Sequence, residues 1–202
     1  MLIKDCQDQY LFGPTKRAET HDEHVWMNAE SSRMPEKYKR NYLKDREAKI
    51  LLDQATKRLK ISLERILTSK SKVELVETEF AEIFLTGGKS ILVKTENDLF
   101  PTLVFSEFFA SAPRAVVDMG AVPYVCKGAN VMRPGIRRFE GEFAKGDLVL
   151  VVDERYGKPL AIGESLLDRS EAEGATQGIV IKNVHFVGDR IWNFLKEFGA
   201  EA

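Results

Sequence analysis

Apolar residues along the chain predict a helix first and a set of strands after it. Between residues 48 and 59 they recur at three- and four-residue spacing, as Ala48, Leu51, Leu52, Ala55 and Leu59. This spacing predicts an amphipathic helix with one buried face. A second, short helix is expected after Ser62, because serine caps helix N-termini well.

The next segment has the pattern of an antiparallel sheet. Residues 83–85 and 91–93 are apolar runs that flank Gly87-Gly88. Glycine tolerates positive φ, so this pair favours a tight hairpin between two strands. Helices followed by such a sheet indicate a small α+β domain over residues 34–112.

After Pro113 the predicted elements become shorter and more frequent. Asp118 is a suitable N-cap for a helix over about residues 119–127, and Gly128 is expected to end that helix in a left-handed conformation. Pro134-Gly135 suits a type II turn. The expected strands cover residues 115–117, 130–132, 147–153, 160–163, 178–181 and 184–187. So many short strands predict a mostly β, barrel-like module over residues 113–196, followed by a C-terminal tail of residues 197–202.

The first part of the chain has a different character. Residues 1–33 contain acidic and basic side chains but no sustained helical or strand periodicity, which is typical of a poorly ordered arm. Met34 comes directly before the lysine-rich helical pattern, so it could instead be the true start of the protein. Both interpretations stay open. A peptide from residues 1–33, found by mass spectrometry in protein made from its own gene, would exclude the late start.

Composition and charge narrow the class of protein. The 202 residues are 44% hydrophobic and 30% charged, which suits a soluble globular protein. A formal net charge of -1 gives no global attraction to nucleic acid or membrane. Residues 34–72, however, hold twelve basic against five acidic side chains, a local net charge of +7. This segment is either a second RNA surface or a solvated face, and Tyr38 and Tyr42 within it either stack on bases or pack on the sheet.

Cysteine content and hydropathy suggest a compartment. Cys6 and Cys126 are the only cysteines, which excludes a disulfide framework and a four-cysteine zinc site and favours a reducing environment. No apolar run approaches the ~20 residues of a membrane span, and the opening residues lack the apolar region of a secretory signal. We therefore expect a cytoplasmic protein.

Catalytic and metal-binding motifs are weak. His21-Asp22-Glu23-His24 offers two imidazoles but lacks the ligands of a structural zinc site. Gly87-Gly88-Lys89-Ser90 imitates the end of a P-loop without its upstream glycine. Asp118 is better explained as a helix cap than as a catalytic acid, and His185 as a structural histidine. We predict no enzymatic activity, no metal and no cofactor.

Several motifs in the second half are similar to a known module. They are Val117-Asp118-Met119-Gly120-Ala121-Val122, Lys127-Gly128-Ala129-Asn130-Val131-Met132 and Arg133-Pro134-Gly135-Ile136. Together they resemble a PUA domain, the RNA-binding module of pseudouridine synthases and archaeosine transglycosylases. Leu99-Phe100-Pro101-Thr102, Asn183-Val184-His185-Phe186 and Trp192 extend the resemblance to the pre-PUA/PUA two-domain family of archaeal PUA proteins and eukaryotic malignant T-cell amplified sequence proteins. This resemblance implies an α+β N-terminal pre-PUA domain followed by a mostly β PUA pseudo-barrel.

The resemblance also implies a function and a site. It implies a non-enzymatic RNA-binding protein of translation that binds tRNA or the small ribosomal subunit. In PUA families the glycine segment after the helix and the following strand contact RNA, which implies the binding residues Lys127, Gly128, Ala129, Met132, Arg133 and Gly135. Arg137 and Arg138 would add cations for phosphates. The structural alternatives are a helix end at Gly128, a turn at Gly135 and a solvated loop for the arginines.

Two other functions stay open. The first domain could be a protein adaptor, because eukaryotic members of the resembled family pair with the density-regulated protein. An exposed apolar patch around Phe80, Ile83 or Phe84 would serve such docking. Alternatively, the chain could be an auxiliary RNA-binding subunit of an RNA-modifying complex. The sequence does not identify the RNA, the protein partner or the oligomeric state.

Overall fold

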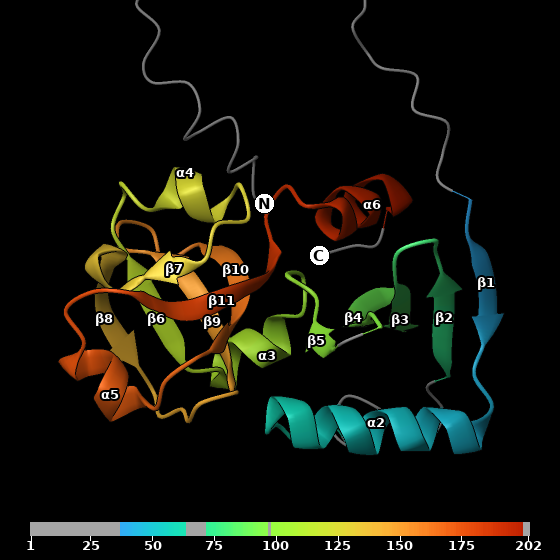
Figure 1. Cartoon of the computed structure of the whole chain (residues 1–202). Helices are drawn as coiled ribbons and strands as arrows, with labels where there is room; N and C mark the ends of the chain where they lie inside the picture. The colour runs from blue at the N-terminus through green and yellow to red at the C-terminus, as the bar shows by residue number, and fades with distance from the viewer. Residues whose placement is uncertain (1–36, 64–71, 97, 200–202) are drawn as a thin grey trace, which may run out of the picture.

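The chain forms two domains, each built around one sheet (Figure 1). The computed structural model describes residues 37–63, 72–96 and 98–199. The first sheet has the strand order β1-β2-β3-β4-β5 and the second has the order β7-β11-β10-β9-β6-β8. An α+β domain followed by a mostly β domain is therefore confirmed. The expected N-terminal arm and most of the short helix expected after Ser62 lie outside the described residues.

The elements follow one another along the chain in two groups. The first domain contains β1 (Lys39–Tyr42), α2 (Asp45–Leu59), β2 (Val73–Glu77), β3 (Glu82–Thr86), β4 (Lys89–Lys94), β5 (Leu99–Pro101) and α3 (Ser106–Ser111). The second contains β6 (Arg114–Val117), α4 (Val122–Val125), β7 (Val131–Met132), the 3-10 turn η1 (Arg133–Gly135), β8 (Ile136–Glu140), β9 (Leu148–Asp153), β10 (Pro159–Ser165), α5 (Arg169–Gly174) and β11 (Ile179–Phe186). Helix α6 (Arg190–Phe198) ends the described chain.

Local sequence signals account for most of the first domain. Leu51, Ala55 and Leu59, spaced by four, form the buried stripe of α2, as predicted. Gly87 and Gly88 both have positive φ, 56° and 82°, in the hairpin between β3 and β4. All neighbouring strands of this sheet are antiparallel. The predicted hairpin is therefore confirmed.

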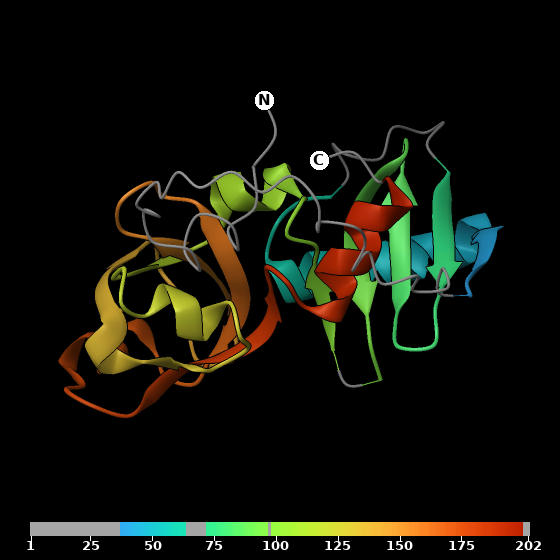
Figure 2. The same cartoon turned by 90° about the horizontal axis from the view of Figure 1, so that it is seen from above.

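Helix α6 returns from the second domain to the first. Figures 1 and 2 show α2 and α6 on opposite faces of the first sheet. The rings of Phe194 and Phe198, one helical turn apart, lie 5.8 and 5.2 Å from the ring of Tyr38, and Phe194 lies 6.0 Å from Phe80. The helix begins at Asp189, whose carboxylate accepts the N–H of Trp192 at 2.7 Å. It runs to Phe198, past the expected boundary at residue 196, and its aromatic face packs against the first domain.

Three expectations for the second domain were wrong in detail. The helix expected over residues 119–127 is only four residues long, α4, with turns on both sides. The type II turn expected at Pro134-Gly135 is the 3-10 turn η1. The two strands expected over residues 178–181 and 184–187 form one strand, β11. Its pairing with β10 shifts register at Ile162/Gly163, so an irregularity replaces the expected break.

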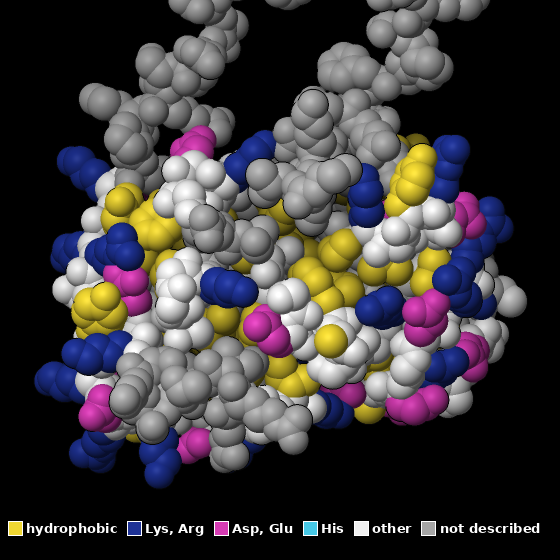
Figure 3. Space-filling view, turned by 180° about the vertical axis from the view of Figure 1, so that it is seen from behind, with side chains coloured by type: hydrophobic (Ala, Val, Ile, Leu, Met, Phe, Trp, Pro, Cys, Tyr) yellow, Lys and Arg dark blue, Asp and Glu magenta, His cyan; other side chains and the backbone are white. Residues whose placement is uncertain are grey.

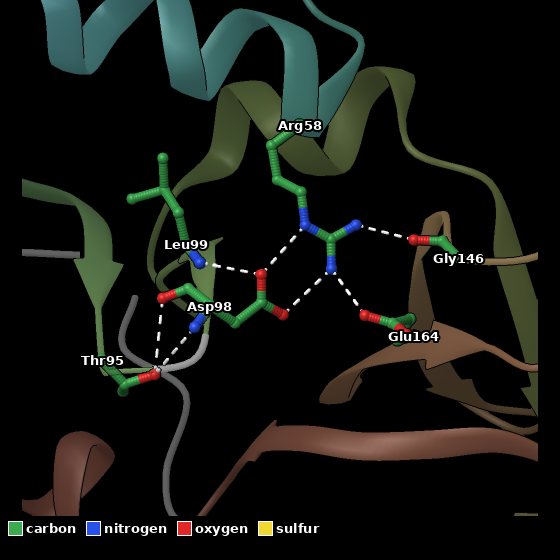
Figure 4. A network of polar contacts seen from close by, with 6 residues as sticks. All are labelled: Arg58, Thr95, Asp98, Leu99, Gly146 and Glu164. Carbon is green, nitrogen blue, oxygen red and sulfur yellow. Dashed lines mark hydrogen bonds and ion pairs between the residues drawn. The ribbon is translucent and has the colours of Figure 1, made fainter.

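A polar network joins the two domains (Figure 4). The Arg58 guanidinium on α2 donates to both carboxylate oxygens of Asp98 at 3.0 and 2.9 Å, within its own domain. It also donates to the Gly146 carbonyl at 2.7 Å and to Glu164 Oε2 at 2.8 Å, in the second domain. Next to it, Lys60 Nζ lies 2.7 Å from Asp147 Oδ2. The hydrogen bond with Asp98 raises the pKa of Arg58 above its usual value, so this cation stays charged.

A buried histidine lies at the same junction. The ring of His185, on β11, is fully buried and its centroid lies 5.9 Å from the Phe100 ring of β5. Its Nδ1 lies 2.6 Å from Asp189 Oδ2, the carboxylate that also caps α6. His185 therefore has the structural position expected for it.

Candidate nucleic-acid interface

The predicted RNA-binding residues lie on the segment that connects α4 to β8, residues 127–138, which we call the α4–β8 rim. A hydrogen bond holds the turn that leads into α4, the helix before the rim. In this turn Asp118 Oδ1 accepts the N–H of Ala121 at 2.8 Å. Asp118 is therefore not the N-cap of the helix, as the sequence predicted, because the N-cap of α4 is Ala121; its carboxylate instead holds the turn that precedes α4.

Gly128 turns the chain at the end of α4. Its φ of +85° is left-handed, as predicted. A Cβ at this position would lie 2.9 Å from the ring of Phe186, so glycine is also required for packing. Lys127 and Ala129 on either side are exposed. The turn at Gly128 therefore places two exposed residues, Lys127 and Ala129, side by side with a half-buried glycine.

Asn183 of β11 holds the same turn through hydrogen bonds. Its Nδ2 donates to the carbonyls of Val125 and Ala129, both at 3.1 Å, and its backbone N–H donates to Asn130 Oδ1 at 2.9 Å. The sequence analysis did not identify this positioning residue. The available signal was an amide side chain within a strand whose other residues are mostly apolar.

Exposed apolar side chains lie beside this turn. Met132 is 54% exposed and pairs across β7 and β11 with Ile179, which is also exposed. Tyr124 on α4 is 67% exposed, and its carbonyl accepts the N–H groups of Lys127 and Ala129. The sequence analysis identified Met132 but not Tyr124. Such side chains can contact bases, whose faces are apolar.

The structure does not bring the three predicted arginines into one cluster. The Arg133 guanidinium donates to the Ile136 carbonyl at 2.9 Å and to the Glu173 carbonyl, at the end of α5, at 3.4 Å. Arg137 Nε lies 3.2 Å from Glu154 Oε2, on the β9–β10 loop. Arg138 Nε lies 2.9 Å from Glu140, its neighbour on β8. Arg137 and Arg138 are more than half exposed, whereas Arg133 is held against the domain.

Gly135 has a packing role. Its carbonyl accepts the N–H of Asp118 at 2.9 Å, and a Cβ added to it would lie 3.0 Å from the Cβ of Ala121. The start of β8 therefore lies directly against the turn that precedes α4. A larger residue at 135 would separate these two parts of the interface.

Positive and negative side chains are mixed on one face of the protein. Figure 3 shows Lys and Arg side chains spread over the face that it presents, with Asp and Glu among them. Within the basic segment of residues 34–72, Arg58 and Lys60 contact the second domain, and Arg40 pairs with Glu74. The Glu74 hydrogen bond raises the pKa of Arg40.

The two tyrosines of the basic segment differ. Tyr38 packs on α6 through Phe194 and Phe198, as the packing alternative expected. Tyr42 is exposed, with Lys72 Nζ 5.8 Å from its ring centroid. Tyr38 is still 46% exposed and Tyr42 is 64% exposed, so Tyr42 offers the more open ring of the two.

The apolar docking patch expected in the first domain is not present. Ile83 and Phe84 are buried in the sheet. Phe80 is partly buried under Phe194 of α6, and the Arg190 guanidinium lies 4.3 Å from its ring centroid. The prediction was wrong because α6, from the far end of the chain, packs on Phe80, while the adjacent strand residues Ile83 and Phe84 are buried on opposite faces of a sheet that has a helix on each face.

Within residues 37–63, 72–96 and 98–199, no three His, Cys, Asp or Glu side chains lie together as metal ligands. His21 and His24, which the sequence analysis did not favour as a metal site, lie outside these ranges. Among the helices of the described chain, none combines the length and apolar composition that a membrane span requires.

Family models agree with the two domains. The model of the PUA domain matches residues 113–187, and the model of a domain of unknown function, DUF1947, matches residues 39–106. The fold and the rim thus define a PUA-domain protein.

Individual relatives extend the match over both domains. An uncharacterized protein of Methanocaldococcus jannaschii is 37% identical over 134 residues, which are 66% of this chain and 83% of that protein. Translation machinery-associated protein 20 of Saccharomyces cerevisiae is 29% identical over 143 residues, 67% of this chain and 79% of the relative. Malignant T-cell-amplified sequence 1 of Rattus norvegicus is 28% identical over 137 residues, 65% and 75% of the two chains. The crystal structure of a hypothetical protein from Pyrococcus horikoshii, 30% identical, superposes with a TM-score of 0.64 over 76% of this chain and 98% of its own.

The chain belongs to the two-domain family that joins a pre-PUA (DUF1947) domain to a PUA domain. Relatives in this family carry names that associate them with the translation machinery.

Proposed function

We propose that this protein binds RNA through the α4–β8 rim and acts in translation, without catalysis, on tRNA or the small ribosomal subunit. The observation that carries the proposal is the left-handed glycine turn at Gly128, flanked by the exposed residues Lys127 and Ala129, in a PUA domain. The name of the yeast relative supports the link to translation. A role of this kind belongs in the cytoplasm.

The rim residues divide into contacts and supports. Lys127 and Arg137 are exposed cations that would contact phosphates. Gly128 and Ala129 would let a sugar-phosphate backbone approach closely, and Met132 would contact a base or sugar. Arg133 and Gly135 would support the structure of the rim and not contact RNA directly, because Arg133 donates to backbone carbonyls and Gly135 packs on Ala121. Arg138 adds an exposed cation beside Glu140.

RNA binding tests the proposal directly. Fluorescence anisotropy with labelled tRNA, and co-sedimentation with small ribosomal subunits, should detect binding by the full chain. The variant Lys127→Gln/Arg137→Gln should bind more weakly and should lose part of the salt dependence, because each lost phosphate contact releases about one counterion fewer.

The control is Lys89→Gln, an exposed lysine on the hairpin of the first domain. This variant should bind as the wild type does. If the wild type and the double variant bind RNA with equal affinity, the α4–β8 rim is not the binding site. If the wild type binds neither tRNA nor the small ribosomal subunit, the proposed function is wrong.

A further inference from the structure

The turn between β9 and β10 presents an exposed aromatic ring between two cations. Tyr156 is 48% exposed. The Arg155 Cζ lies 5.2 Å from its ring centroid and the Lys158 Nζ lies 5.4 Å from it. An aromatic ring with this much exposure contributes little to the core, since the large buried side chains of this domain lie on its strands. Its position therefore calls for another explanation.

This turn is held in one conformation by a buried carboxylate. Asp153, at the end of β9, is almost fully buried. Its Oδ1 accepts the N–H groups of Arg155 and Tyr156 at 2.9 and 2.6 Å, and its Oδ2 accepts that of Lys158 at 2.9 Å. Because the backbone that carries the ring is already ordered, a ligand on the ring meets a small conformational entropy cost.

The turn is also continuous with the α4–β8 rim. The Glu154 carboxylate accepts the N–H of Met119 at 3.2 Å and pairs with Arg137 Nε at 3.2 Å. The Glu154 N–H donates to the Val117 carbonyl at 2.9 Å, which ties the turn to the strand before α4. Tyr156 thus lies two residues after Glu154, which contacts Arg137 of the rim directly.

We propose that Tyr156 is a stacking platform for an unpaired nucleobase of bound RNA, and that Arg155 and Lys158 contact the phosphates on either side of that base. This inference rests on the proposed RNA-binding function and extends its site to a second loop. The chemistry fits single-stranded RNA, because every base has a face that stacks on an aromatic ring and every linkage carries a negative charge. Along the turn Arg155 precedes Tyr156 and Lys158 follows it, and both cations lie within 5.4 Å of the ring centroid, so phosphates next to a stacked base would be within their reach.

The test uses the full chain and a single-stranded RNA of about twelve nucleotides, the length range that such sites cover. The RNA carries 2-aminopurine, whose fluorescence falls on stacking. Tyr156→Leu should weaken binding roughly 5- to 100-fold, the range for loss of one base–aromatic stack, and should abolish the fluorescence change. Tyr156→Phe keeps the ring and should bind as the wild type does. Arg155→Gln should instead lower the salt dependence of binding.

A matched control is Tyr42→Leu, which removes another exposed tyrosine with a nearby lysine, in the first domain. Unchanged affinity of this control supports the assignment. Equal losses in both Tyr→Leu variants, or wild-type affinity of Tyr156→Leu, overturn it while the proposed function stands. If the wild type binds no RNA, both the proposed function and this inference are wrong.

Discussion

Arg58 and Glu164 join the two domains directly, with 2.8 Å between Nη2 and Oε2. The arginine lies on α2 of the first domain and the glutamate on β10 of the second. The same guanidinium also donates to the Gly146 carbonyl of the second domain and to Asp98 of its own domain, so one side chain joins one partner in the first domain to two in the second (Figure 4). The relative placement of the pre-PUA and PUA domains depends on this contact, together with α6.

Replacing Arg58 by Met should therefore weaken the junction. The change leaves two half-buried carboxylates without their cation and should lower the free energy of unfolding by about 2 kcal/mol. Urea unfolding measures this loss, and small-angle X-ray scattering should detect a wider range of domain placements. Lys57→Met, an exposed neighbour on α2, is the control and should unfold as the wild type does. Identical unfolding of the two variants would contradict this role of Arg58.

The stability from Arg58 should not vary in the ordinary pH range. Its pKa is raised by the hydrogen bond with Asp98, so the folded state holds this proton more tightly than the unfolded state. Such a group stabilises the fold fully below the unfolded pKa and loses that contribution only as the pH rises through the folded pKa, which lies above the ordinary pKa of arginine. The stability difference between wild type and Arg58→Met, measured by urea unfolding at about pH 6 and pH 9, should be equal. A difference that shrinks by half over this interval would refute the assignment.

Gly128→Ala should destabilise the α4–β8 rim. The new Cβ meets the Phe186 ring in a left-handed conformation, and we expect a loss of about 2 kcal/mol. Gly174→Ala is the matched control, because this glycine ends α5 with nothing within 4 Å of a Cβ. Alanine there should leave stability unchanged or raise it slightly. Thermal unfolding followed by circular dichroism compares the two, and equal midpoints would show that the turn tolerates a side chain.

Arg133 and Arg138 should differ in stability although both are arginines of the same segment. Arg133→Gln removes hydrogen bonds to the carbonyls of Ile136 and Glu173 and should cost about 1–2 kcal/mol. Arg138→Gln removes an exposed pair with Glu140 and should change stability by less than about 0.5 kcal/mol. Chemical denaturation of both variants measures the contrast. The reverse order would mean that Arg133 is a free surface cation.

Phe194→Ala should loosen α6 from the first sheet. The buried ring contacts Tyr38 and Phe80, and a phenylalanine deletion in such a position costs about 3 kcal/mol. Glu197→Ala, exposed on the same helix, controls for a change in helix propensity. Hydrogen exchange of α6 amides reports the effect, which should be absent in the control. Unchanged protection in Phe194→Ala would show that other contacts hold the helix.

Local patterns predicted the elements whose partners are near in sequence. The stripe of α2, the Gly87-Gly88 hairpin and the left-handed Gly128 each depend on spacing or on one residue type. The two strands expected in place of β11 show the limit of such patterns. Lys182 and Asn183 interrupt the apolar run, yet the strand continues because Asn183 makes its side-chain hydrogen bonds to the turn after α4.

The sequence predicted which segment forms the candidate RNA site, but it did not predict which partners the side chains of that segment contact. Arg133 and Arg137 are four residues apart in sequence, yet one reaches the end of α5 and the other the β9–β10 loop. Tyr156 and its two cations lie about twenty residues from the rim in sequence and adjoin it only through the contacts of Glu154. Proximity in sequence does not fix which partners a long side chain finds.

The amino-acid sequence alone determined the two-domain organisation, the α2 stripe, the glycine turns and the resemblance to the PUA family, because these depend on periodicity, backbone freedom and short motifs. Only the tertiary structure decided which surfaces remain open. Helix α6 covers Phe80 and packs on Tyr38, and Arg58 is used between the domains. The physical reason is that burial and ion pairing join residues more than a hundred positions apart, and no local pattern records such distant contacts.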